Sequence, residues 1–248
     1  MFQQILSSLK TYGRAFQLLK ELKLWKYFAI PILISFLTAI IVVASSLYFA
    51  ENLGNQIVKI WQFSWGGEFV STLSHIIGGL LIFLVGLVLY KHIVMAFSAP
   101  FMSPVSEKIE AHYLGSVSKE EGMKAFSNSL LRAIKINARN LGKELLFIFP
   151  LFFLSLIPVI GIVFSILIFL IQAYYAGFGN MDYTLERHYN YSDSIKFVKK
   201  NKGIAIGNGV GFMLLLLIPV IGFILVLPLS VVAASYKTVL ALDANDTI

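Results

Sequence analysis

The 248-residue sequence predicts an all-α integral membrane protein, with two long transmembrane helices and two re-entrant hairpins that enter the bilayer and turn back. Hydrophobic residues make up 58% of the chain and charged residues 13%, about half the charged fraction of a soluble domain. The motif Leu-Ile-Pro-Val-Ile-Gly occurs at 156–161 and again at 217–222, each time within a long apolar stretch. Proline removes a helical donor and glycine tolerates reversal, so each copy should divide its stretch into two short arms. The expected hairpin tips are Pro158 with Gly161 and Pro219 with Gly222.

The N-terminal half of the chain contains the two predicted spans. Residues 2–22 carry apolar side chains near helical spacing with basic residues between them, which predicts an amphipathic helix on the membrane surface. The apolar runs 27–50 and 72–97 are each long enough to cross a bilayer. We expect Pro100 and Pro104 to interrupt the second helix.

A more polar stretch follows and predicts cytoplasmic helices over residues 105–143. Ser118 and Glu121 have the spacing of a capping box that starts one of these helices. Its buried apolar stripe is expected to consist of Leu130, Leu131, Ile134 and Ile136.

The C-terminal half holds the two hairpins, predicted over residues 145–178 and 203–240, with one short helix at 192–200 between them. The second hairpin begins with glycines at positions 203, 207 and 211. This spacing is typical of a face that lets two helices pack closely, but it equally fits a flexible entry loop. All these segments belong to a single polytopic membrane domain, residues 1–248.

The distribution of basic residues predicts the orientation of the chain. If both hairpins return to the side on which they start, only Lys59 of the 20 lysines and arginines lies on the far side. The other 19 then mark the cytoplasmic side, and both termini lie there too. A topology with four complete spans would instead place five basic residues between 187 and 202 outside, so the charge bias favours hairpins.

Several function classes receive no support from the sequence. The chain has no cysteine, which excludes disulfides and thiol chemistry, and it has no recognisable catalytic or nucleotide-binding motif. We therefore expect neither an enzyme nor a cofactor. Glu107, Glu110 and His112 are more simply a solvated helix face than metal ligands, and His92 is interpreted as an interfacial residue at the end of a span. The net charge of +7 is better explained by cytoplasmic loops facing anionic lipid than by nucleic acid.

Anion binding is the chemistry that remains. Lys23 and Lys26 stand directly before the first span, and a helix N-terminus offers unpaired N–H groups and partial positive charge to an oxyanion. Anchoring to lipid headgroups would explain the same two lysines more simply, and both explanations stay open. If the anion site lies elsewhere, Arg132, Lys135 and Arg139 share a helical face and form the next candidate.

Several motifs together resemble one family. Residues 98–110 resemble the "APF…AE..E" stretch of the CysZ-type sulfate permeases, a branch of the etoposide-induced-protein-like membrane proteins. The segment 157–161 is similar to the family's "IPxIG" hairpin tip. Asp182-Tyr183 resembles its "DYP" segment, although Thr184 replaces the proline. The family-motif positions whose roles stay unassigned are Trp25, Pro100, Phe101, Glu107, Glu110, Asp182 and Tyr183.

The resemblance implies uptake of sulfate for cysteine synthesis, a bacterial inner-membrane location and a homo-oligomer. One departure concerns the anion site. The family carries "G-x-R-R-F" before the first span, where this chain has Lys23-Leu24-Trp25-Lys26-Tyr27. Lysine is a point charge that cannot grip an oxyanion with a two-pronged guanidinium. The rival hypothesis is a non-transporting membrane scaffold or membrane-shaping protein of the same superfamily.

Overall fold

The computed structural model describes residues 1–60, 67–115, 122–218 and 220–246, and within these ranges all regular structure is helical. Four stretches are long and apolar enough to cross a membrane: Ala29–Phe49, Thr72–Leu114, Gly161–Leu185 and Gly222–Ala244. The predicted all-helical membrane class is therefore confirmed. The helices are α1 (Phe2–Glu21), the 3₁₀-helix η1 (Leu24–Tyr27), α2 (Ala29–Ile60), α3 (Gly67–Leu114), α4 (Met123–Ser155), α5 (Gly161–Leu185), α6 (Tyr191–Lys200), α7 (Lys202–Leu216) and α8 (Ile221–Asp246).

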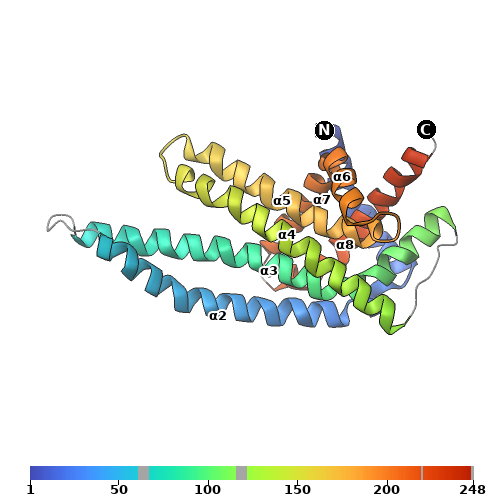
Figure 1. Ribbon diagram of the computed structural model, residues 1–248, viewed down its shortest axis with the longest axis horizontal. Coiled ribbons are helices and arrows are strands. Elements are labelled where there is room, and N and C mark those ends of the chain that lie inside the picture. The colour runs from blue at the N-terminus through green and yellow to red at the C-terminus, as the bar shows by residue number, and fades with distance from the viewer. Residues whose placement is uncertain (61–66, 116–121, 219, 247–248) are drawn as a thin grey trace.

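The long helices form pairs that extend to different distances from the end of the molecule that carries both termini. Helices α2 and α3 lie side by side and extend farthest from the end that carries both termini (Figure 1). Helices α4 and α5 form a second pair whose tip does not reach as far. Helix α7 packs against both α5 and α8, and with 15 residues it is shorter than a bilayer span.

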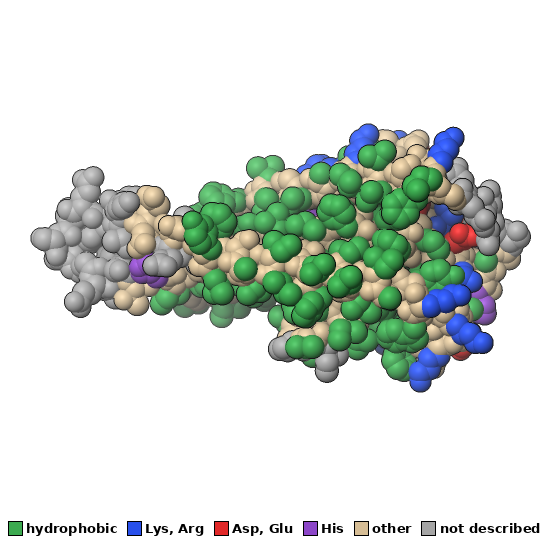
Figure 2. All heavy atoms as spheres, turned by 90° about the horizontal axis from the view of Figure 1, so that it is seen from below, with side chains coloured by type: hydrophobic (Ala, Val, Ile, Leu, Met, Phe, Trp, Pro, Cys, Tyr) green, Lys and Arg blue, Asp and Glu red, His purple; other side chains and the backbone are tan. Residues whose placement is uncertain are grey.

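The surface has the polarity expected of this arrangement. Figure 2 shows hydrophobic side chains along much of the elongated part, and lysine and arginine side chains at the end away from the α2–α3 tip. Exposed leucines, isoleucines and phenylalanines of α2, α4 and α5 form this apolar surface. Lipid would satisfy such a surface, whereas water would not.

Both copies of the repeated motif form turns, as the sequence predicts. At the first tip Val159 has φ +70°, and at the second Val220 has φ +62°. The glycines serve close approach: a Cβ on Gly161 would lie 2.2 Å from the Ser155 carbonyl oxygen, and one on Gly222 would lie 2.3 Å from that of Leu215. Valine therefore adopts the left-handed backbone conformation at each tip. Glycine, which has no side chain, lets the start of the second helix approach the backbone at the end of the first. Pro158 lies in the first turn, while Pro219 lies outside the described residues.

The glycine spacing at the start of the second hairpin is a helix-packing face. Helix α1 crosses α7 there, and an added Cβ on Gly207 would lie 2.4 Å from the carbonyl oxygen of Ile5. A Cβ on Gly211 would lie 2.2 Å from the Tyr12 ring. The hydroxyl of Tyr12 then donates to the Asn208 carbonyl at 2.6 Å. Of the two open interpretations, close helix packing is confirmed.

Helices α5 and α7 approach each other even more closely. A Cβ on Gly209 of α7 would lie 1.6 Å from the carbonyl oxygen of Ala173, and one on Gly177 of α5 would lie 1.8 Å from that of Ala205. Backbone therefore touches backbone at this crossing, which only small residues allow. The buried amides of Asn180 and Asn208 add a hydrogen bond of 2.9 Å.

The expectation that Pro100 and Pro104 interrupt the second helix is wrong, because α3 continues through both. Helix α3 changes direction near its C-terminal end but remains helical (Figure 1). Polar groups bind its carbonyls around the prolines: Tyr183 donates to Met95 at 2.7 Å, and Ser103 donates to Ala99 at 3.1 Å. The two prolines free the carbonyls of Ala96 and Pro100, so these bonds fix the bent segment from its flanks and do not replace the lost ones.

The predicted apolar stripe over 130–136 is also wrong in part. Ile136 is fully buried, but the side chains of Leu131 and Ile134 are 65% and 40% exposed. The buried face of α4 is instead largely polar and includes Ser129, Asn137, Asn140 and Glu144. The buried polar side chains have partners on α3: Glu144 binds Lys91, and Asn137 lies 3.0 Å from His92. The expected capping box lies outside the described residues, and α4 begins after Gly122.

Candidate functional site

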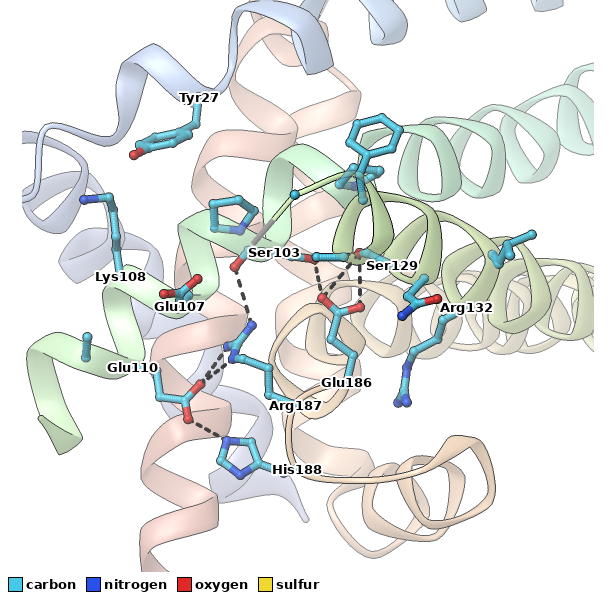
Figure 3. Close-up of a pocket in the computed structure, with 18 of the residues that line it drawn as sticks. Tyr27, Ser103, Glu107, Lys108, Glu110, Ser129, Arg132, Glu186, Arg187 and His188 are labelled. Atoms are coloured by element: carbon cyan, nitrogen blue, oxygen red, sulfur yellow. Dashed lines mark hydrogen bonds and ion pairs between the residues drawn. The ribbon is translucent and has the colours of Figure 1, made fainter. Parts of the chain in front are cut away.

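A polar cavity of about 1530 Å³ opens near the C-terminal end of α3. Its walls come from four parts of the chain: the segment before α2, the last turns of α3, the first half of α4 and the connection from α5 to α6. Figure 3 shows the acidic and basic side chains that point into it. The cavity therefore joins residues that are distant in sequence.

Glu110 is the centre of one ion-pair network in this cavity. Arg187 donates to one of its carboxylate oxygens through Nε at 2.9 Å and through Nη2 at 2.7 Å. His188 lies 2.6 Å from the other oxygen. The remaining guanidinium nitrogen of Arg187 donates to Ser106 at 2.9 Å and to the Tyr183 carbonyl at 3.0 Å. Glu110 therefore acts with Arg187 and His188, which argues against the solvated helix face expected for it.

Glu186 forms a second network with two serines. Its carboxylate accepts from Ser129 at 3.1 Å and from Ser103, and the two serine hydroxyls lie 2.8 Å apart. Burial raises the pKa of Glu186 above its ordinary value of 4.5, while the serine hydrogen bonds act in the opposite direction. The negative charge of this carboxylate is therefore disfavoured in the folded protein.

Arg132 is fully used in holding the structure together. Its Nε and Nη2 atoms grip the Asp182 carboxylate at 3.1 and 3.0 Å. Nη2 also donates to Ser194 at 2.6 Å, and Nη1 donates to the Tyr189 carbonyl at 2.7 Å. A guanidinium with these partners has little left to offer an anion. The basic face of Arg132, Lys135 and Arg139 is therefore weaker as an anion site than its sequence spacing indicates.

The two lysines proposed from the sequence are both exposed and lie just before α2. Lys23 adopts a left-handed conformation, with φ 50° and ψ 45°, at the start of η1. This is the position of glycine in the family motif that the segment resembles, and glycine adopts that conformation without strain. Trp25 packs edge-on against Phe28, with ring centroids 6.4 Å apart.

Lys26 does not itself line the cavity, but the next residue, Tyr27, does. The ammonium of Lys26 lies 5.3 Å from the centroid of the Tyr27 ring, and that of Lys108 lies 5.9 Å from it. Lys108 also lines the cavity. Lys26 of the predicted anion site and Lys108, which its sequence position does not mark, thus contact the same tyrosine ring.

The remaining family-motif positions have structural contacts in or near the cavity. Pro100 and Glu107 line it. Phe101 packs edge-on against Phe126 at 5.9 Å, and Tyr183 donates its hydroxyl to α3. Asp182 holds Arg132. The resemblance therefore marked residues that join α3, α4 and α5, although their pairing could not be read from spacing.

A second polar cluster lies deep between α3, α4 and α5. Glu144 binds the Lys91 ammonium with one oxygen, and its other oxygen lies 2.8 Å from Nε2 of His92. Lys91 also donates to the Gln172 carbonyl at 3.0 Å, and Nδ1 of His92 lies 3.0 Å from Asn137. All three ionisable side chains are at most 3% exposed. The interpretation of His92 as an interfacial residue is therefore wrong.

The sequence held a weak signal for this cluster. Lys91 and His92 are adjacent near the end of an apolar run, which is also where lysine commonly reaches the interface. Their partner Glu144 lies more than 50 residues away on another helix. Because spacing carries no information about such pairs, only the packing of α3 on α4 reveals the cluster.

Comparisons with known proteins bear on the whole chain. The family model described as "Sulfate transporter CysZ/Etoposide-induced protein 2.4" matches residues 11–227. Proteins named "Sulfate transporter CysZ" from three strains of Vibrio cholerae serotype O1 are 26% identical to this chain over 216 residues. Each alignment covers 82% of this chain and 83% of the relative. The match therefore includes all four walls of the polar cavity.

Proposed function

The chain belongs to the Sulfate transporter CysZ/Etoposide-induced protein 2.4 family, and we propose that it carries sulfate or a closely related oxyanion across the cytoplasmic membrane. The observation that carries this proposal is the nearly full-length match to a family and to relatives named as sulfate transporters. Four helices of sufficient length and apolarity agree with it. Supply of sulfur for cysteine synthesis is the role that this transport would serve.

The membrane arrangement that we propose has two complete spans, from α2 and α3. The α4–α5 and α7–α8 pairs enter the bilayer and return, and both termini lie in the cytoplasm of a bacterial cell. The turns at both repeated motifs and the charge distribution support this arrangement. The resemblance adds a homo-oligomer, which a mass measurement of the purified protein in detergent would test.

The absence of cysteine makes the topology directly testable. Single cysteines at Ser192 and at Asn128, both exposed, should react only with reagents applied from the cytoplasmic side. Ser192 belongs to α6, which lies beside the termini in Figure 1, and Asn128 belongs to the first turns of α4. Labelling of the Ser192 position from outside would contradict the re-entrant hairpins and favour four complete spans.

The anion site that we propose consists of Lys26, helped by Lys23 and by the N-terminus of α2. Charge-assisted hydrogen bonds to sulfate contribute roughly 1.5–3 kcal/mol each, so losing one should weaken binding about tenfold or more. Lys26→Gln should therefore reduce sulfate binding and uptake, while Lys26→Arg should retain or improve both. If the double variant Lys23→Gln/Lys26→Gln binds sulfate as well as the wild type, the site lies elsewhere.

Transport itself is tested with the purified protein in liposomes and radiolabelled sulfate. We expect uptake that excess unlabelled sulfate abolishes and excess chloride does not. Protein-free liposomes give the background. Binding and uptake that never exceed this background, in protein that is correctly inserted, would favour the non-transporting scaffold.

A further inference from the structure

Two lysines from distant parts of the chain meet at one tyrosine on the rim of the polar cavity. Lys26 lies in η1, whereas Lys108 lies near the end of α3, 82 positions later in the sequence. Their ammonium groups lie 5.3 and 5.9 Å from the centroid of the Tyr27 ring. The two charges are therefore within about 11 Å of each other, on stems that can rotate toward a shared ligand.

Both arginines of the cavity are already held by carboxylates, and Lys135 lies 4.5 Å from the centroid of the Tyr191 ring, on the α4 side. Arg187 is held by Glu110, and Arg132 is held by Asp182. Within the described part of the chain, by contrast, neither Lys26 nor Lys108 forms an ion pair with a carboxylate. Two unneutralised ammonium groups that share one aromatic ring repel each other, and a divalent anion between them would remove that repulsion.

The orientation of Lys108 agrees with such a role. Figure 3 shows its ammonium directed toward Tyr27, while the neighbouring Glu107 carboxylate lies lower, beside the cavity. Consecutive residues of a helix point about 100° apart, so Glu107 does not cover the face that Lys108 presents. The Tyr27 ring also supplies a favourable surface for both cations while the site is empty.

We propose that Lys108 is a second substrate-binding residue, which holds the oxyanion together with Lys26 across Tyr27. The inference rests on the proposed function and deepens it, because it supplies a second cation where the family motif has an arginine pair. An arginine pair offers two adjacent positive groups from one segment. This chain would assemble two from separate helices, so that the substrate contacts η1 and α3 together.

The test measures equilibrium binding of radiolabelled sulfate to the full-length protein in lipid nanodiscs. Lys108→Gln and Lys108→Met should each weaken binding about tenfold or more, whereas Lys108→Arg should bind within about twofold of the wild type. Methionine keeps the apolar stem against Tyr27, so a loss with Met identifies the charge. The matched control is Lys20→Gln, because exposed Lys20 also lies over a ring, 4.9 Å from Phe16, but does not line the cavity.

The outcomes separate this inference from the proposed function. If Lys26→Gln weakens binding but the Lys108 variants bind like Lys20→Gln, the second-cation inference is wrong and the proposed function stands. If the wild-type protein binds no sulfate, the proposed function is wrong and the inference falls with it. Size-exclusion profiles identify any variant that does not fold, and the three substitutions at Lys108 provide independent measurements.

Discussion

The crossing of α5 and α7 provides a prediction whose magnitude follows from geometry. In Gly209→Ala the new Cβ would lie 1.6 Å from the Ala173 carbonyl oxygen, about 1.8 Å short of ordinary contact at 3.4 Å. The obstacle is backbone, so the two helices must separate. Overpacking of this kind typically costs about 1–3 kcal/mol, and the higher helix propensity of alanine returns about 1 kcal/mol. Because backbone cannot move aside as a side chain can, the cost should lie in the upper part of this range, about 2–3 kcal/mol, which leaves a net destabilisation of about 1–2 kcal/mol.

Gly142→Ala is the matched control. Gly142 lies in the helical interior of α4 and has nothing within 4 Å of the position of a Cβ. The same substitution there should stabilise the protein by about 0.5–1 kcal/mol through helix propensity alone. The two variants should therefore differ in sign.

Thermal unfolding in one detergent, followed by size-exclusion chromatography of heated samples, measures the difference. For a chain of this size 1 kcal/mol corresponds to roughly 2–4 °C in Tm, so Gly209→Ala should melt lower and Gly142→Ala slightly higher than the wild type. Helix α5 also carries Asp182 and leads into Glu186, so sulfate binding should fall with Gly209→Ala as the cavity wall moves. Equal melting temperatures for the two alanine variants would refute a backbone-to-backbone contact.

Three further predictions use the same unfolding assay. Glu144→Leu should lower the free energy of unfolding by about 3–5 kcal/mol because it leaves the buried Lys91 unpaired. The double variant Lys91→Met/Glu144→Leu should recover most of that loss, and equal stability of the two variants would contradict a buried ion pair. Lys23→Gly should match or exceed wild-type stability by up to about 1 kcal/mol, since it relieves a left-handed lysine, whereas Lys23→Gln should not. Burial raises the pKa of Glu186 in the folded protein above its ordinary value of 4.5. The folded wild type should therefore lose stability as the pH rises from 4.5 through the raised pKa of this carboxyl group. Glu186→Gln should lack this loss, so its stability relative to the wild type should increase toward pH 8. Parallel stability–pH profiles of the two proteins would contradict the raised pKa.

The sequence-based prediction was most accurate where a local rule decides the structure. The repeated motif predicted both turns because proline and glycine act on their own neighbourhood. The same rule failed at Pro100 and Pro104, where side chains of α3 and α5 bind the backbone of the helix. The bond to Met95 comes from Tyr183, about 80 residues further on, and no local pattern predicts it.

The polar site could be predicted only in fragments. Lys26 was singled out because positive charge before a span is a local feature, and its role in anion binding stays a prediction. Asp182 and Glu110 were marked by resemblance, but their partners Arg132 and Arg187 became visible only when α3, α4 and α5 were packed together. The stripe over 130–136 failed because polar side chains with partners on other helices occupy much of the buried face of α4, while Leu131 lies in the wall of the polar cavity.

The contact between α1 and the glycine face of α7 has a consequence for how the protein is made. Helix α1 leaves the ribosome before α7, and its binding surface on α7 begins only at Lys202, about 180 residues later. At about 5–20 residues per second, α1 waits roughly 10–35 seconds for its partner. During this interval its apolar side chains need another cover, and a helix with one apolar face can rest on the lipid surface. In the folded protein Ser8 and Tyr12 face α7, whereas Phe2, Leu6 and Phe16 stay exposed. The side chains that rest on lipid during synthesis can therefore keep that contact after α1 has docked.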